Sequence, residues 1–154
     1  MNTTYLEPTQ AAGAELFTRG ITGSVVVLNL LRLRETADYS ENPELAREVP
    51  ITGREAYQRY IDHTLPFLEA SGGELLFLGE GGPNFIGPAE ERWDLMMLVK
   101  QNSLQDFLAF AQNPDYLAGM GHRTAALEDS RLLPLVPFEG HSILRISASA
   151  GSDQ

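Results

Sequence analysis

The amino-acid sequence predicts an α+β domain with the ferredoxin-like order of elements, strand–helix–strand–strand–helix–strand. Four apolar runs predict the strands, at 24–34, 74–79, 93–100 and 132–136, and two amphipathic segments between them predict the helices. The runs 24–34 and 93–100 are the most uniformly apolar, which is typical of central strands buried on both faces. Pro134 lies in the last run, and a proline belongs on an edge strand because it has no N–H group to donate. We therefore expect the first and third strands in the centre of the sheet and the second and fourth at its edges.

The segment before the first strand predicts a short helix from Pro8 to Arg19, which Gly20 ends. Residues 35–51, after that strand, are acidic and contain Asn42-Pro43, so we expect a loop there. Structureless loops of this length are uncommon. Two interpretations stay open for it, a solvated excursion and a lid over a site.

The helix after this loop begins at a capping box, in which Thr52 and Glu55 satisfy opposing helix N–H groups. Its apolar residues continue at helical spacing to Leu68, and Pro66 predicts a kink or a restart. The glycine-rich linker 79–88 between the second and third strands predicts a hairpin connection. A phosphate loop is disfavoured because the linker has no Gly-Lys-Ser/Thr and leads into a strand.

Ser103 can cap the second helix of the domain, which Asn113-Pro114 interrupts before further helical turns at 115–127. A short fifth strand is predicted at 141–146. The domain organisation that follows has an N-terminal extension with a short helix at 1–23, the ferredoxin-like domain at 24–137 and a C-terminal extension at 138–154. The end of that extension is small and polar, so we expect it to be frayed.

The composition excludes several classes of function. A formal net charge of −10 argues against nucleic acid and anionic membrane surfaces as partners, because both require clustered Lys and Arg. The sequence has no cysteine, so a disulfide framework and a thiolate metal site are excluded. The first residues lack the basic start and apolar core of a signal peptide, and no apolar run is long enough to span a membrane. We expect a cytoplasmic protein.

The charged segment Gly121–Leu133 precedes the last strand and contains the candidate catalytic residues His122 and Asp129. A histidine titrates near neutrality and a carboxylate can orient it, which suits proton transfer. Arg123 can hold the anionic end of a small organic acid through two parallel hydrogen bonds. The alternative interpretation is a structural junction between helix and strand, with Arg123 bound to Asp129 or Asp94.

Other candidate ligand-binding residues come from four predicted elements and are expected to converge between the helices and the sheet. Tyr57 and Tyr60 lie on one helix face, where core packing is the alternative to lining a cavity. Asn29 interrupts an apolar strand, so its amide either binds the charged segment or faces a pocket. The candidate ligand-binding residues are therefore Asn29, Tyr57, Tyr60, Trp93, Asp94 and Arg123. A packed layer whose polar groups satisfy one another would indicate a structural network instead.

We expect no metal and no organic cofactor. None of the three histidines lies at a ligand spacing from another, and haem would require His122 as a single axial ligand. A nucleophilic triad is disfavoured because Ser130 has no Gly-x-Ser-x-Gly elbow around it.

Several motifs in this order resemble a family of uncharacterised bacterial proteins in the dimeric α+β barrel superfamily. They are Leu28–Arg34, Gly53–Tyr60, Ile86-Gly87-Pro88, Trp93-Asp94 and His122–Ser130, and the resemblance covers roughly residues 8 to 137. The family has no assigned reaction, and its superfamily includes cofactor-free monooxygenases, an isomerase, haem proteins and ligand-binding regulators. A function cannot be taken from such a fold.

With two helices on one face, the other face of an apolar sheet needs a cover, and we expect a homodimer with sheets packed face to face. Three functions stay open. They are a cofactor-independent enzyme for proton transfer or oxygenation of a small organic acid or aromatic, a non-catalytic dimer that binds a small organic ligand, and a structural or interaction module.

Overall fold

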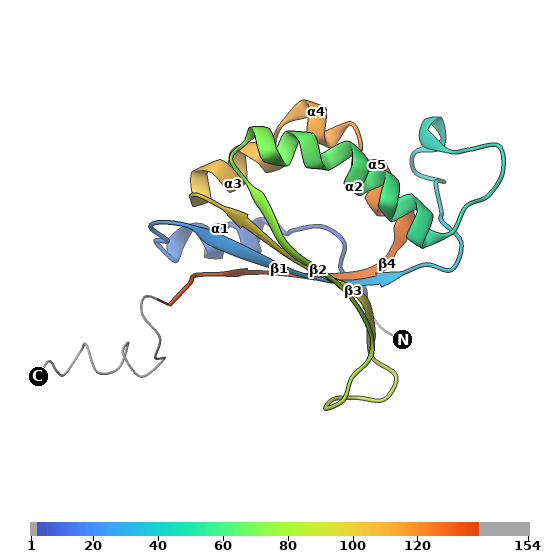
Figure 1. The fold of residues 1–154 in the computed structure, drawn as a ribbon, viewed down its shortest axis with the longest axis horizontal. Helices are drawn as coiled ribbons and strands as arrows, with labels where there is room; N and C mark the ends of the chain where they lie inside the picture. Colours follow the sequence, from blue (N-terminus) through green and yellow to red (C-terminus); the bar gives the residue numbers. More distant parts are fainter. Residues whose placement is uncertain (1–2, 139–154) are drawn as a thin grey trace, which may run out of the picture.

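The computed structural model describes residues 3–138, which form one four-stranded antiparallel sheet with helices packed on one of its faces (Figure 1). The strands are β1 (Val25–Leu33), β2 (Glu74–Pro83), β3 (Arg92–Gln101) and β4 (Leu127–Leu135), and their order in the sheet is β2-β3-β1-β4. The predicted α+β, ferredoxin-like fold is confirmed. β1 and β3 are central, and Pro134 lies on the edge strand β4.

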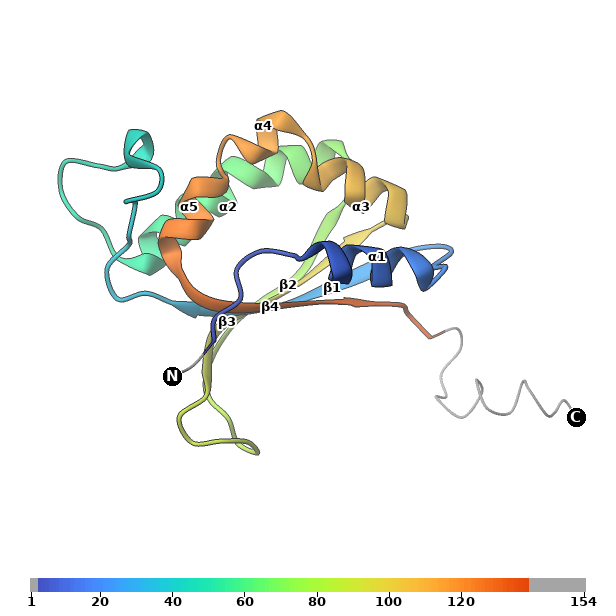
Figure 2. The ribbon, with the colours of Figure 1, turned by 180° about the vertical axis from the view of Figure 1, so that it is seen from behind.

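The sheet differs from the prediction mainly in the length of its strands. β4 begins at Leu127 rather than at Leu132, so the segment with Asp129 and Arg131 is already paired with β1. The charged side chains of this segment hide the alternating pattern of a strand, which is why the sequence predicts a junction between helix and strand there. β2 and β3 run on into the predicted hairpin connection, which extends beyond the sheet (Figures 1 and 2).

Five helices pack around the sheet within the described residues: α1 (Gln10–Thr18), α2 (Gly53–Ala70), α3 (Leu104–Ala111), α4 (Pro114–Leu117) and α5 (Met120–Ala126). The capping box of Thr52 and Glu55 is present at the start of α2. α2 continues without interruption through Pro66, so the predicted restart does not occur. Pro66 is flanked by two buried residues, Thr64 and Leu68. Their packing holds the helix against its neighbours and offsets the hydrogen bond that the proline cannot donate.

The core lies between α2, α5 and the sheet. Leu31, Leu127, Ala56 and Ala126 are almost fully buried there, and Tyr57 is packed among them. α1, in contrast, contributes no buried residue and lies beside β1 and β4 (Figure 2). α2 and α5 therefore cover most of the core on the helical side of the sheet.

The face of the sheet opposite α2 has no helix over it and is apolar along its centre, while Lys100 and Arg131 lie on the same face nearer its margins. Register places Leu28 beside Leu98 of β3 and Leu133 of β4, with Phe77 of β2 next in the same row. Phe77 and Leu133 are 51% and 52% exposed. This row, with Val26, Leu30, Met96 and Leu135 on the same face, is called the open face below.

Residues 35–51 connect β1 to α2 and are anchored along their length. Thr36 forms an isolated bridge with Thr52, and the N–H of Ala37 donates to the Ile51 carbonyl at 2.9 Å. The short 3-10 helix η1 (Pro43–Leu45) lies in the middle of this segment. The predicted fifth strand at 141–146 and the frayed end at 147–154 lie outside the described residues.

Candidate functional site

α5 carries His122 and Arg123 into two different surroundings, because consecutive residues of an α-helix point about 100° apart. His122 is half-buried and contacts the 35–51 segment. Arg123 is 8% exposed and lies in the layer between the helices and the sheet. The structure therefore does not bring the two residues together on one ligand position.

His122 is paired with a tyrosine from the loop. The Tyr39 hydroxyl lies 2.8 Å from Nδ1 of His122, and the two rings meet edge to face with centroids 5.6 Å apart. The residue before Tyr39 is fixed to α5, since the N–H of Asp38 donates to the Ala125 carbonyl at 2.9 Å. Tyr39 and His122 thus form a positioned hydrogen-bonded pair, which is called the Tyr39–His122 pair below.

The close packing of loop and helix at this pair depends on Gly121. A Cβ at Gly121 would lie 2.7 Å from Leu45 Cδ1 and 2.7 Å from Asn42 Cγ, both in the loop. A side chain at this position would require the side chains of Leu45 and Asn42 to move away from α5.

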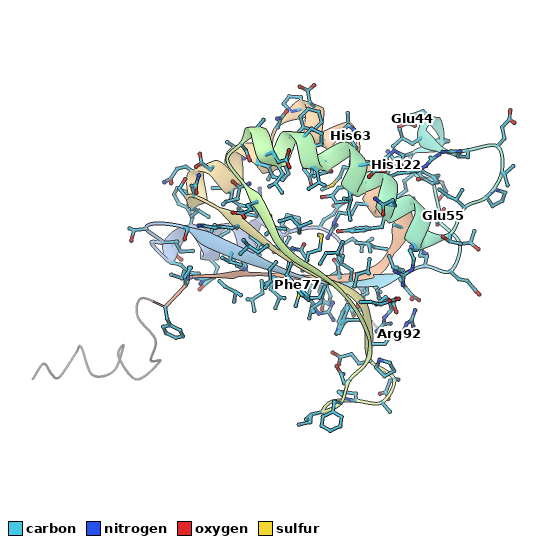
Figure 3. All side chains as sticks on the ribbon, in the orientation of Figure 1. Glu44, Glu55, His63, Phe77, Arg92 and His122 are labelled. Carbon is cyan, nitrogen blue, oxygen red and sulfur yellow. The ribbon has the colours of Figure 1, made fainter. Side chains whose placement is uncertain are left out.

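Three effects lower the pKa of His122 below its ordinary value of 6.5. Burial is the largest, because it disfavours the charged imidazolium, and electrostatic repulsion from Arg59 and His63 adds to it. His122 is therefore neutral near pH 7 and able to accept a proton. Figure 3 shows His122 and His63 on the helical side of the molecule, near α2.

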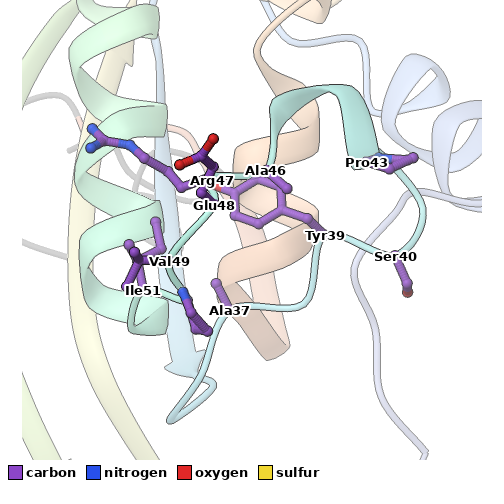
Figure 4. Close-up of a pocket in the computed structure, with 10 residues that line it drawn as sticks. Ala37, Tyr39, Ser40, Pro43, Ala46, Arg47, Glu48, Val49 and Ile51 are labelled. Carbon is purple, nitrogen blue, oxygen red and sulfur yellow. The ribbon is translucent and has the colours of Figure 1, made fainter.

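A hollow of about 270 Å³ lies within the 35–51 segment, and Tyr39 of this pair is among the residues that line it (Figure 4). Tyr39 lines the hollow with its ring, and the wall also carries the charged side chains of Arg47 and Glu48. The remaining lining residues are mostly apolar: Ala37, Ser40, Pro43, Ala46, Val49, Pro50 and Ile51. A second and shallower depression is lined by Leu33, Arg34, Glu35, Thr52, Arg54, Arg92 and Asp94.

Arg123 holds the N-terminal segment rather than a carboxylate. Its guanidinium donates to the Leu6 carbonyl at 2.7 Å and to Ser130 Oγ at 3.3 Å. Within residues 3–138 it has no ion-pair partner. The predicted alternative, an ion pair from Arg123 to Asp129 or Asp94, is therefore wrong, because both carboxylates bind other groups.

Asp129 is buried and fixes the N-terminal segment from the strand side. Its Oδ1 accepts from the N–H of Tyr5 at 2.8 Å and from Arg131 at 2.8 Å. The Arg131 guanidinium lies between two rings, 4.9 Å from the Tyr5 centroid and 5.1 Å from the Trp93 centroid. Asp129 therefore does not orient His122. The imidazole of His122 bonds to Tyr39 instead.

The tyrosines of α2 lie in the packed helix–sheet layer. The Tyr60 hydroxyl is 2.8 Å from that of Tyr116, and the Tyr57 hydroxyl has a longer contact of 3.9 Å to Met97 Sδ. Burial raises the pKa of both Tyr57 and Tyr60, so both phenols stay protonated. The side-chain amide of Asn29 donates to the Val27 carbonyl at 3.3 Å. It therefore bonds within its own strand, and neither binds the charged segment nor faces one of the two hollows.

The two remaining candidates lie at the end of the β1–β3 pair. Asp94 accepts from the N–H of Leu33 at 2.8 Å and from Arg92 at 3.0 Å, and so continues the strand pairing through side chains. Trp93 donates to Glu91 at 3.0 Å. The structure therefore brings together Tyr57, Tyr60 and Arg123, and leaves Trp93, Asp94 and His122 elsewhere.

Tyr39 was missed by sequence reasoning, because it stands in a loop among acidic residues. The available signal was a single aromatic ring in a long loop, which costs free energy if it stays in water. His63, in contrast, is of a residue type common in functional sites but has a structural role here. Its Nε2 bonds to the Asp115 carbonyl at 2.7 Å and its ring packs on Phe67, which is a structural role.

Within the described part of the chain, no three His, Asp or Glu side chains converge in a way that could hold a metal ion. No helix among residues 3–138 is both long and apolar enough to cross a membrane.

Comparison with known proteins gives matches among solved structures. The RPA0582 protein of Rhodopseudomonas palustris, described as a protein of unknown function, is 33% identical to this chain. The match includes 90% of this chain and 100% of the RPA0582 chain, and the two superpose with a TM-score of 0.78. A crystal structure of the methylated RPA0582 protein gives 32% identity, 92% and 100% coverage and a TM-score of 0.80. A dimeric protein of unknown function with a ferredoxin-like fold from Bacteroides fragilis is 15% identical, with coverage of 73% and 94% and a TM-score of 0.45.

No family model and no curated protein matches the sequence. The identity to the Rhodopseudomonas palustris protein extends over that whole chain and most of this one, and the TM-score of 0.78 shows that the two share a fold. The chain therefore belongs to the family of the RPA0582 protein of Rhodopseudomonas palustris.

Proposed function

We propose that this protein is a homodimer in which each subunit binds a small organic molecule in the hollow of the 35–51 segment and moves a proton on it. The observation that carries the proposal is the Tyr39–His122 pair, a neutral imidazole hydrogen-bonded at 2.8 Å to a phenol that lines a hollow. Groups whose pKa is shifted beside a concave surface are typical of sites that move protons.

The pair can pass a proton in two linked transfers. A ligand in the hollow gives its proton to the Tyr39 oxygen, while the Tyr39 hydroxyl gives its own proton to Nδ1 of His122. The products are the ligand anion, an unchanged Tyr39 hydroxyl and an imidazolium. Burial and the charge of Arg59 disfavour the imidazolium, so the proton returns readily to the ligand at a different atom, which completes an isomerisation.

The ligand class follows from the lining of the hollow. Most of the wall is apolar, and it carries one cation, Arg47, together with one carboxylate, Glu48. We assign Arg47 to the anion that forms and Glu48 to the polar part of the ligand. A formal net charge of −10 repels small anions at long range, so a local cation is needed to retain one. A neutral or singly charged organic acid with an apolar body fits this wall.

Dimerisation through the open face is part of the proposal. The row with Leu28, Leu98, Leu133 and Phe77 is apolar and lies on the face that the helices leave uncovered. A second copy covers it with an identical surface, which is the usual symmetry of a homodimer.

A second candidate function is ligand binding without catalysis. It is favoured by the helix–sheet layer, where Tyr60 bonds to Tyr116 and Arg123 bonds to Leu6 and Ser130. Polar groups that satisfy one another in this way form a structural network. The hollow is then a binding site alone, and the proton-transfer role of His122 falls away.

The test is base-catalysed ring opening of 5-nitrobenzisoxazole, which reports proton removal from carbon by absorbance. We expect the wild-type protein to accelerate it, with a pH profile that follows His122, and His122→Gln to lose at least about tenfold, within the range for a positioned general base. Tyr39→Phe should lose a similar factor because the relay is broken. His63→Gln is the matched control: it keeps most of the rate, and its pH profile moves slightly upward because His63 contributes to the lowered pKa of His122.

Equal rates in the wild-type protein and His122→Gln would overturn proton transfer. If the probe then still shifts the NMR resonances of residues that line the hollow, the non-catalytic function is the correct one.

A further inference from the structure

The N-terminal segment occupies a buried polar site through its backbone. The Leu6 carbonyl accepts from Arg123 at 2.7 Å, and the Tyr5 carbonyl accepts from Ser130 Oγ at 2.6 Å. The Tyr5 N–H donates to Asp129 Oδ1 at 2.8 Å. None of these contacts belongs to the strand ladder, so residues 5 and 6 are held by side chains alone.

Arg123 is a buried cation whose acceptors here are neutral. It is 8% exposed, and in the stretch 3–138 no carboxylate lies within 4.0 Å of it. A buried charge is costly unless an opposite charge or strong hydrogen bonds compensate it. A carbonyl oxygen compensates a guanidinium less well than a carboxylate does, because charge-assisted pairs are stronger.

An apolar position lies beside this cation. The Leu6 side chain packs against the core cluster that contains Tyr57 and Ala126. The guanidinium of Arg123 donates to the carbonyl of the same residue, Leu6, and is therefore next to this part of the core. Release of residues 5 and 6 would therefore expose a cation, a hydroxyl donor and an apolar recess together.

We propose that Arg123 and Ser130 form a binding site for a small apolar monocarboxylate, and that Tyr5 and Leu6 are a displaceable strap that closes it. In the open state the two carboxylate oxygens accept from Arg123 and Ser130 in place of the two carbonyls. The apolar body of the ligand fills the place of the Leu6 side chain. This site is separate from the hollow beside Tyr39 and does not depend on the function proposed there.

The strap sets the apparent affinity. A ligand that binds only the open state has its affinity reduced by the fraction of molecules that are open. Loss of the Leu6 anchor raises that fraction while Arg123 and Ser130 stay in place.

The experiment uses 4-methylpentanoate, whose branched body matches a leucine side chain, and the neutral 4-methylpentanamide as its control ligand. Binding is measured by NMR titration of wild type, Leu6→Ser and the matched control Leu16→Ser on α1. We expect the carboxylate to bind Leu6→Ser at least about tenfold more tightly than wild type. Leu16→Ser should behave as wild type, and the amide should bind each protein more weakly.

Two further measurements separate the site from a general loosening of the fold. Hydrogen exchange of the Tyr5 amide should speed up when the carboxylate saturates the wild-type protein, because the strap leaves Asp129. Ser130→Ala in the Leu6→Ser background should weaken carboxylate binding several-fold. If Leu6→Ser does not fold, Leu6→Ala takes its place with the same expected order.

Equal binding of carboxylate and amide to Leu6→Ser overturns the carboxylate site. Equal affinity of the carboxylate for wild type and Leu6→Ser, with an unchanged Tyr5 amide at saturation, overturns the strap.

Discussion

At the scale of single residues, position on α5 decides the chemistry of two neighbours. His122 meets a phenol from a loop, whereas Arg123 meets a backbone carbonyl from the N-terminal segment. A histidine beside an arginine in the sequence suggested one shared ligand, but the turn of the helix separates the two side chains.

The pKa of His122 tests whether the positive charge of Arg59 acts on this imidazole. We expect its pKa to lie below 6.5, and Arg59→Gln to move it back toward 6.5, since this variant removes a positive neighbour while burial is unchanged. Arg54→Gln is the matched control, because Arg54 is on the same helix and pairs with Glu80 on the surface. NMR titration of the imidazole measures all three. A His122 pKa that is the same in Arg59→Gln would contradict the electrostatic account.

The same shift has a consequence for stability. A lowered pKa in the folded state means that the unfolded chain binds more protons between that pKa and 6.5. The free energy of unfolding therefore falls as the pH decreases from 6.5 through the folded pKa, and it is unaffected by this group at higher pH. His122→Gln should lack this part of the pH dependence.

At the scale of elements, close approach of backbones fixes where α2 begins. Gly53 is buried, and a Cβ on it would contact the Arg34 carbonyl oxygen and lie 2.8 Å from the Ala126 carbonyl oxygen. Its N–H donates to the same Arg34 carbonyl at 3.1 Å. The first turn of α2 thus touches the ends of both β1 and α5.

Gly53→Ala should therefore destabilise the protein by roughly 1–3 kcal/mol, the usual cost of overpacking a site that cannot move. The control is Gly13→Ala in α1, where nothing lies within 4 Å of the added methyl group. It should be neutral or stabilising by up to about 1 kcal/mol, because alanine favours the helix. Urea unfolding measures both variants, and equal stabilities would show that α2 can shift to accept the methyl group.

At the scale of the whole molecule, the exposed apolar row of the sheet determines the expected assembly. We expect a dimer at micromolar concentration by sedimentation, and Leu133→Asp should dissociate it because an unpaired carboxylate would be buried between the two sheets. Phe17→Asp is the control. Phe17 is 68% exposed on α1, away from the open face, so the dimer should persist. A wild-type protein that sediments as a monomer would refute the assembly.

The sequence by itself determined the order of elements, the central place of β1 and β3, and the edge position of Pro134, because periodicity and proline chemistry act over a few residues. It also located the start of α2, since the hydrogen bonds of a capping box join residues three apart. Tertiary structure decided the candidate sites. Tyr39 and His122 are separated by 83 residues, and Leu6 and Arg123 by 117. Such pairs depend on the path of a loop and of a terminal segment across the finished fold, and no local pattern encodes that path.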